Sequence, residues 1–400
     1  MRVNFLICAF ITFFYIAPAQ NIKLLDNLRN KEVRAKGLYD EFRYQEAARF
    51  YSQVYTGDTT RKDIALLVGD CYRLTYDYID AEVWYSTGLK GHEPKDATYY
   101  LHYAQSLSNN EKYQEAKVWF QKYAAFEADH VRTNKHIESL NQLHFHFKDS
   151  TAVELKPWSV NTTFAEWAPA YYGNKIVFIS NRGDTKKFKN VLNWNLDSYN
   201  DLFVTQESED GSMQEPVPFH SVTNSSLHEG PLVFYDDDKI IFTQNESNGK
   251  KGGGHLSLFT AKLNAEMEFQ SIKKLDLVEG DYSVAHPAIT PDYKNLYFAS
   301  NMPGGYGNSD LYKAIWDGEK WGKPVNLGPE INTTGNESFP FAMNQDELVF
   351  TSDGHGGLGG RDLFRVDFSQ DHIVLDNLGY PFNSSKDDFG YISNETGSVG

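Results

Sequence analysis

The first part of the chain, between about residues 21 and 147, has apolar positions that recur with a helical period. Three alanines lie 34 and 35 residues apart, and each follows an aromatic residue by three positions and precedes another by four: Ala47, Ala81 and Ala116. A small residue also lies twelve positions before each alanine: Ala35, Gly69 and Ala104. This period predicts three helical hairpins, because small side chains at fixed positions let paired helices approach closely. A further helix, about 131–144, would cap the stack.

From about residue 164 the pattern changes to short apolar runs separated by turn residues. Most of the stretch 295–341 recurs from Glu347 in the same register, with paired glycines in the loop of each copy. Two weaker copies begin near residues 174 and 238. A proline opens each of the four copies, at intervals of 62, 56 and 53 residues: Pro169, Pro231, Pro287 and Pro340. Repeats of this length and composition predict the blades of a β-propeller.

One such blade is expected to be a four-stranded β-meander. The expected strands are 287–289, 296–299, 310–312 and 324–328. Proline and aspartate at 291–292 favour a turn between the first two strands, because proline presets φ and aspartate bonds nearby amides. The last strand contains a proline, which an edge strand tolerates because it does not need every N–H.

The end of the chain contains the start of a fifth copy. Residues 382–392 align with residues 331–341 at an offset of 51, so Asp388 takes the place of Glu337. Propellers avoid exposed strand edges by closing their ring. We therefore expect these residues to be the front of a longer protein with about six blades, in which four blades and the start of a fifth form an open arc.

The N-terminus has the features of a secretory signal. Met1-Arg2 precede an apolar run that is too short to span a bilayer, and the small residues at 17–19 fit a cleavage site. Cys8 lacks the preceding small residue that a lipid-anchored cysteine would have. Removal of residues 1–19 leaves Cys71 alone, so no intrachain disulfide is possible and Cys71 is expected to be a shielded core residue.

A linker with one lone strand, 152–155, is expected between the two patterns. His144 and His146 precede it, and on a strand they would share one face. No further ligand is placed near them by spacing, so neither a metal site nor a cofactor is expected. Acidic runs such as 236–238 and 387–388 are expected to be solvated surface charge rather than calcium or acid–base sites.

Composition excludes nucleic acid as a partner. The formal net charge is −16, and no cluster of lysine and arginine offers the basic stripe that phosphates require. An apolar content of 40% with 15% aromatic residues is enough to fill two or more cores. The chain is therefore predicted to be a multidomain α + β protein, with an α-solenoid of three helical hairpins followed by a β-propeller. The expected segments are a signal peptide at 1–19, repeats at 20–147, a linker and lone strand at 148–163, and blades at 164–400.

The helical part resembles the tetratricopeptide repeat, whose period is 34 residues. The resemblance implies a protein-binding groove formed by the first helices of the hairpins. The residues that would face the groove are Lys36, Tyr39, Asp70, Arg73 and Gln105. The alternative is that the three repeats only form a docking platform for the neighbouring domain.

The blades resemble the WD-like repeats of TolB and its relatives. The resemblance rests on sequence segments such as LYFASNMPGGYGNSDLYKA. The order of signal, three repeats and blades resembles the N-terminal part of the OmpA-family envelope proteins of Bacteroidetes. That resemblance implies type IX secretion or gliding, an outer-membrane-associated periplasmic location, and a small outer-membrane β-barrel protein as partner. The family binds peptidoglycan through a C-terminal domain, to which no residues of this chain correspond.

The predicted function is a non-catalytic scaffold for protein–protein interaction in the cell envelope. The alternative is a carbohydrate-binding or hydrolytic propeller of the sialidase kind. Residues 316–321 resemble the aspartate box of those enzymes, but the leading Ser or Thr is missing, and no G-x-S-x-G nucleophile elbow occurs. Arginines and carboxylates clustered at the propeller mouth would favour the enzyme.

Overall fold

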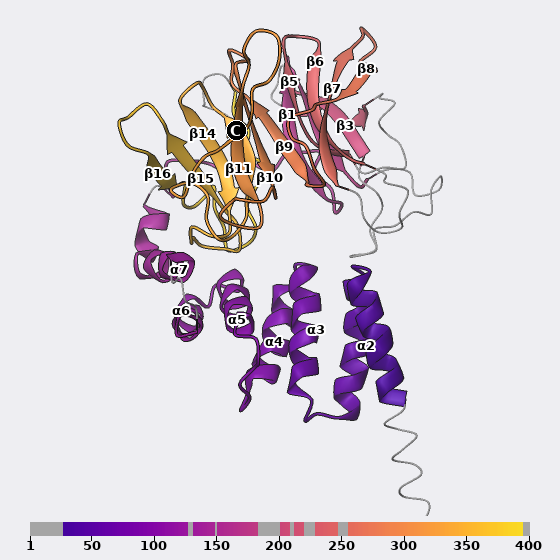
Figure 1. The fold of residues 1–400 in the computed structure, drawn as a ribbon, viewed down its shortest axis with the longest axis vertical. Coiled ribbons are helices and arrows are strands. Elements are labelled where there is room, and N and C mark those ends of the chain that lie inside the picture. Colours follow the sequence, from indigo (N-terminus) through magenta and orange to yellow (C-terminus); the bar gives the residue numbers. More distant parts are fainter. Residues whose placement is uncertain are drawn as a thin grey trace, which may run out of the picture. The chain divides into compact units, whose positions relative to one another are not determined.

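The computed structural model describes residues 27–126, 131–148, 150–182, 201–208, 212–219, 229–246 and 255–394. Packing divides the chain into two units, the first ending at Asn110 and the second beginning at Glu111. Helices form the first unit, whereas helices and four β-sheets form the second (Figure 1). None of the described helices has the length and apolar character needed to cross a membrane.

The first unit consists of helices that follow the predicted repeat. They are a helix at 27–40, α2 (Tyr44–Gly57), α3 (Lys62–Leu74), α4 (Tyr78–Leu89) and α5 (Thr98–Asn109). The small residue Gly69 has the expected role, because a Cβ there would lie only 2.7 Å from the ring of Tyr85. The turns between the two helices of a hairpin contain left-handed residues one repeat apart, Phe42 (φ 61°) and Tyr76 (φ 62°). The prediction of helical hairpins is confirmed.

Cys71 lies in α3 and has no exposed surface. It packs in one apolar cluster with Ala35, Ala47, Tyr51 and Val68. Burial raises the pKa of its thiol well above the ordinary value, because a thiolate would lose its hydration there. The prediction of a shielded core cysteine is confirmed.

The second unit begins with α6 (Tyr113–Ala124), α7 (Val131–Asn141) and the 3-10 helix η1 (Leu143–Phe147). His144 and His146 lie in η1, so the expectation that they share a strand face is wrong. The chain continues α7 in tighter turns there, and Phe145 N donates to Gln142 O at 2.9 Å. Residues 152–155 also form no strand, and none of the described strands pairs with them.

Four antiparallel sheets, blades 1 to 4, follow in chain order, each with its strands in sequential order. Blade 1 contains β1 (Glu166–Tyr172), β2 (Lys175–Ser180), β3 (Asp201–Gln206) and β4 (Val217–Pro218). Blade 2 contains β5 (Glu229–Tyr235), β6 (Lys239–Asn245), β7 (Leu256–Leu263) and β8 (Phe269–Lys274). Blade 3 contains β9 (Val284–Ile289), β10 (Asn295–Ser300), β11 (Asp310–Ile315) and β12 (Val325–Asn326). Blade 4 contains β13 (Glu337–Ala342), β14 (Glu347–Ser352), β15 (Asp362–Asp367) and β16 (Val374–Asn377).

The blades form a propeller whose first strands lie next to one another, β1 beside β5, β5 beside β9 and β9 beside β13. Apolar clusters fill the spaces between consecutive blades. Fully buried aromatic residues anchor these clusters: Phe219, Phe242, Phe298 and Phe350. The four-stranded blades predicted from the repeats are therefore confirmed.

A bulge before the blade-opening proline recurs in the first strands. Ala168, His286 and Phe339 each precede such a proline and have positive φ angles of 48°, 56° and 49°. The pairing with the second strand shifts its register at the same place in all four blades. The bulge takes one residue of the first strand out of the ladder of backbone hydrogen bonds. Proline has no N–H to donate, and at this position the ladder does not need one. In the fifth copy Gly390 has the equivalent conformation, with φ 76°.

Buried asparagines connect the end of one blade to the start of the next. Asn332, between β12 and β13, accepts a hydrogen bond from Leu311 N at 2.8 Å and donates to Leu311 O at 3.0 Å. Its Nδ2 also donates to Asn326 Oδ1 at 2.8 Å. One repeat later the same three bonds join Asn383 to Leu363 and Asn377. We call each set of three bonds an asparagine lock.

An acidic residue lies five positions after the asparagine of each lock and accepts hydrogen bonds from the same turn. Glu337 is fully buried, and its carboxylate accepts hydrogen bonds from Thr333 N (2.9 Å), Thr333 Oγ1 (2.7 Å) and Ser352 Oγ (2.7 Å). Burial raises the pKa of Glu337 to about 7, although these bonds oppose the shift. Asp388 accepts from Ser384 N at 2.7 Å, and burial raises its pKa to about 6. The expectation that Asp388 is solvated surface charge is therefore wrong, because the turn encloses its carboxylate.

The fifth copy contacts both blade 4 and blade 1. The Phe389 ring lies 4.9 Å from that of Phe339 in β13 and 6.5 Å from that of Trp167 in β1. A Cβ on Gly390 would lie 3.5 Å from the backbone nitrogen of Ala168. Residues 389–393 therefore bridge blades 4 and 1 through side chains, where the sequence predicts an open arc. Apolar side chains at the rim of β1 attract this segment, because burying them removes apolar surface from water.

Helix α7 is packed on blade 4. Arg132 forms an ion pair with Asp353 at 3.0 Å, and both side chains are largely buried. His136 Nε2 lies 3.1 Å from Asp353 O, and loss of hydration lowers its pKa to about 3, so the imidazole is neutral. A Cβ on Gly356 would lie 2.7 Å from Lys135 O, so the loop after β14 approaches the helix backbone closely. These contacts hold α7 and blade 4 as one body.

Replacing Glu337 by glutamine should reduce the pH dependence of propeller stability. The pKa of Glu337 is raised from 4.5 to about 7, so its protonated form stabilises the fold fully below pH 4.5. That contribution is lost as the pH rises through about 7, and its full size is about 3 kcal/mol. Urea unfolding followed by tryptophan fluorescence at pH 5 and pH 7.5 should show a smaller pH effect in Glu337→Gln than in the wild type. The exposed Glu330→Gln variant is the control, and an unchanged pH effect in Glu337→Gln would contradict the assignment.

Candidate functional site

The residues predicted to face a groove lie on the first helices of the hairpins. Lys36 and Tyr39 are in the helix 27–40, Asp70 and Arg73 are in α3, and Gln105 is in α5. Three of the five, Tyr39, Asp70 and Arg73, belong to one group of polar side chains around the Asp70 carboxylate. We call this group the Asp70 cluster; its members are Tyr39, Asp70, Arg73, Tyr85, Tyr99 and His102.

The carboxylate of Asp70 is the centre of the cluster. It accepts a hydrogen bond from Tyr85 Oη at 2.6 Å, and His102 Nδ1 lies 3.0 Å from the same oxygen. Arg73 Nη2 is 3.5 Å from that oxygen, and Arg73 Nε donates to Tyr85 Oη at 3.1 Å. The cluster therefore joins α3, α4 and α5 through side chains, and it fixes the orientation of the Arg73 guanidinium.

Opposing effects set the ionisation of the cluster. Burial raises the pKa of Asp70, but the hydrogen bond and charge of His102, with the charge of Arg73, outweigh it and leave the pKa below its ordinary value. Burial also raises the pKa of Tyr39 and Tyr99 well above the usual range, and the Asp70 charge adds to the shift. Asp70 is thus ionised and the tyrosines are neutral donors at neutral pH.

The other two predicted residues lie outside the cluster. Lys36 is exposed and pairs with Asp40 at 2.9 Å, one helical turn along. Gln105 is half-buried on α5, three residues after His102. A surface ion pair such as Lys36–Asp40 contributes little to stability, so Lys36 can engage a partner without cost to the fold.

Sequence reasoning missed Tyr85, Tyr99 and His102. Tyr85 is the aromatic residue four positions after Ala81, and the repeat pattern does not indicate that its hydroxyl forms hydrogen bonds. His102 lies one helical turn before Gln105, and that spacing could have identified it as a residue of the same face. Its pairing with Asp70 depends on how α5 packs on α3, which the repeat pattern does not specify.

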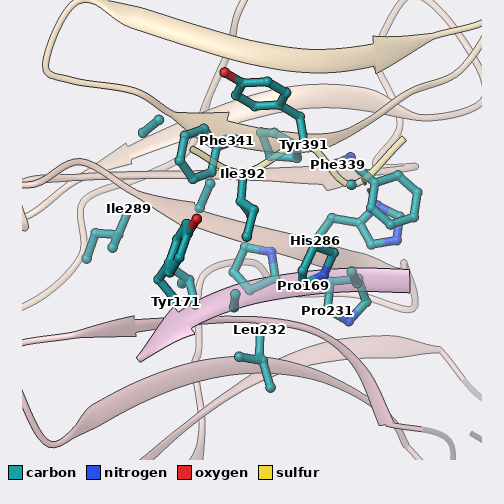
Figure 2. A pocket seen from close by; sticks show the side chains of 18 of the residues that line it. Pro169, Tyr171, Pro231, Leu232, His286, Ile289, Phe339, Phe341, Tyr391 and Ile392 are labelled. Atoms are coloured by element: carbon teal, nitrogen blue, oxygen red, sulfur yellow. Dashed lines mark hydrogen bonds between the residues drawn. The ribbon is translucent and has the colours of Figure 1, made fainter. Parts of the chain in front are cut away.

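The propeller has a cavity at its centre. It has a volume of about 310 Å³, and the first strands of all four blades and residues 390–393 line it (Figure 2). The blade-opening prolines contribute to the wall, together with aromatic side chains that include Tyr171, Phe341 and Tyr391. No arginine, lysine, aspartate or glutamate is among the described residues that line it.

His286 is the one titratable base among the described residues of this wall. Its ring stacks on Phe339 with centroids 4.0 Å apart. Burial lowers the pKa of His286 to about 3, and the charge of Arg361 adds to the shift, so the imidazole is neutral. The cavity can therefore take an uncharged apolar group, and its described wall offers no acid–base pair.

No protein-family model matches the chain, and no curated protein matches it. Among solved structures, the type III secretion chaperone SycD of Yersinia enterocolitica, in complex with a peptide of the translocator YopD, is similar over 30% of this chain and 95% of that chain. The identity is 19% and the TM-score 0.27.

Two further structures are similar over about half of this chain. The putative TolB of Agrobacterium tumefaciens matches 57% of this chain and 87% of its own, with 13% identity and a TM-score of 0.31. A puromycin-hydrolysing peptidase of Mycobacterium tuberculosis matches 53% of this chain, with 13% identity and a TM-score of 0.33. This chain spans only 38% of that peptidase. At these values none of the three similarities assigns a function to the chain.

Replacing Asp70 by asparagine should destabilise the helical unit by about 3 kcal/mol at neutral pH, because the mostly buried Arg73 loses its partner. The pKa of Asp70 is lowered, so its contribution is present above the unfolded pKa and is lost as the pH falls through the folded pKa. Chemical unfolding followed by far-UV circular dichroism should show the difference at pH 7 and its loss in acid. The exposed Glu93→Gln variant is the control. A difference that persists unchanged in acid would show that Asp70 acts by packing alone.

Proposed function

We propose that this protein is a non-catalytic scaffold that binds other proteins through the first helices of its hairpins. The observation that carries the proposal is the Asp70 cluster. Its hydrogen bonds hold Arg73 in one orientation, with 23% of that side chain exposed. A cation fixed in this way loses little conformational entropy on binding, which favours recognition of a partner.

The adjacent residues support the same proposal. Lys36 and Gln105 lie on the same set of first helices, and neither side chain is needed to fill a core. Helical repeats combined with a propeller offer large surfaces for proteins rather than an enclosed reaction site. The described wall of the propeller cavity holds only a neutral histidine as titratable base, and this supports the proposal that the protein is not an enzyme.

The location that we propose is the cell envelope, on the outer-membrane side of the periplasm. It rests on the signal-like residues 1–19 and on the resemblance of the repeats to envelope proteins of Bacteroidetes. A role in type IX secretion, gliding, or anchoring of the outer membrane to peptidoglycan would follow from that resemblance. Anchoring would need a peptidoglycan-binding domain of the kind that the resemblance implies, and the partner would be a small outer-membrane β-barrel protein.

The proposal is tested by affinity capture of crosslinked partners from an envelope extract. The double variant Lys36→Glu/Gln105→Glu should capture at least fivefold less of the specific partner than the wild type. The first substitution reverses a charge on the binding face, and the second adds a negative charge there. Arg49→Glu is the matched control, since Arg49 is exposed on α2, a second helix of a hairpin. Equal capture by the double variant and the wild type would overturn the proposed surface.

A further inference from the structure

A second cavity lies outside the propeller centre, where the segment before blade 1 covers β1 and β2. Its volume is about 280 Å³. The residues that line it include three aromatic side chains, Trp158, Trp167 and Phe178. Polar groups also line it: Lys156, Asn161, Glu166 and Arg182.

Arg182 is nine-tenths buried in this wall. Its Nη2 donates to Glu166 Oε1 at 2.9 Å and to Val160 O at 3.2 Å, and its Nε donates to Ser180 Oγ at 3.2 Å. The guanidinium also lies 5.0 Å from the centroid of the Phe178 ring. Among the hydrogen bonds of the described residues, none uses Nη1. These bonds and the ring contact hold the guanidinium in one orientation at the wall of the cavity.

Glu166 decides which ligands this site can prefer. Its carboxylate pairs with Arg182, so the charge of the guanidinium is already balanced and an anionic ligand would be repelled by Glu166. The second carboxylate oxygen accepts only a long bond, 3.4 Å, from Thr162 N among the described residues. The site therefore offers donors on Arg182 and an acceptor on Glu166 within one small cavity.

We propose that this cavity binds a single neutral sugar ring. Trp158 and Trp167 are only partly buried, and their rings match the C–H face of a pyranose, because both surfaces are flat and apolar. Arg182 can donate a hydrogen bond to one sugar hydroxyl and Glu166 can accept one from a neighbouring hydroxyl, since each hydroxyl both donates and accepts. The volume lies just below the usual range for ligand pockets, which suits one ring rather than an oligosaccharide. This binding is separate from the protein-binding face proposed above and includes no hydrolysis.

The test is saturation-transfer NMR with methyl β-D-glucopyranoside, methyl α-D-mannopyranoside and N-acetylglucosamine as probes on the full chain. At least one probe should bind with a millimolar dissociation constant. Trp158→Ala should weaken it at least tenfold, because it removes one wall of the cavity. Asn161→Ala should weaken it three- to tenfold, and it is a second variant whose exposed position leaves the fold unaffected. Trp316→Ala is the control, because Trp316 lies in blade 3 outside the cavity and should leave binding unchanged.

Three results would overturn the proposal. The first is the absence of binding for all three sugars at 50 mM while the protein remains folded by circular dichroism. The second is binding that is equal in Trp158→Ala, Asn161→Ala and the wild type, which would place the sugar elsewhere. The third is displacement of the sugar by sodium acetate at equal concentration, which would make this an anion site. Loss of binding in both cavity variants and not in Trp316→Ala supports it.

Discussion

The asparagine lock is the interaction that joins blade 3 to blade 4 and blade 4 to the fifth copy. The outer strand of blade 3, β12, has only two residues, so its own ladder cannot fix where the chain leaves the blade. The side chain of Asn332 replaces the missing ladder by pairing with both backbone groups of Leu311. Because those groups are buried, losing their partner would leave an unpaired donor and acceptor, which is more costly than losing a solvated bond.

The lock determines the start of the next blade. Glu337 is five residues after Asn332 and begins the next first strand, so the buried carboxylate fixes where β13 starts. The bulge at Phe339 then turns the blade-opening proline toward the central cavity. The same order of lock, acid and left-handed residue in the fifth copy places Phe389 against Trp167. The repeated spacing thus places one aromatic ring of the fifth copy against blade 4 and blade 1.

The sequence predicted the elements whose signals are local and repeated. The period of the small residues identified the hairpins, and Gly69 has the packing role that this spacing implies. The prolines located the first strands of the blades. Features that depend on contacts between distant segments were not predicted. The pairing of Arg132 with Asp353 joins residues far apart in the chain, and neither repeat pattern specifies how α7 meets blade 4.

The repeat pattern also located some residues of the candidate site and missed others. The repeat register placed Asp70 and Arg73 one helical turn apart on the same helix, whereas their contacts with His102 and Tyr85 depend on how the helices pack. Lys36 and Gln105 were placed on the first helices but not in the cluster. The Arg182 cavity was not predicted, because its wall combines a segment without regular structure and the first blade.

Hydrogen–deuterium exchange of the Asn332→Ala variant, resolved by peptide, tests the central claim most directly. If the lock couples blades 3 and 4, peptides that cover β11 and peptides that cover β13 should both exchange faster than in the wild type, while β1 and β2 keep their protection. Asn308→Ala, at an exposed position in the same blade, should exchange like the wild type. Faster exchange confined to the turn around residue 332, with β11 and β13 unchanged, would contradict the account.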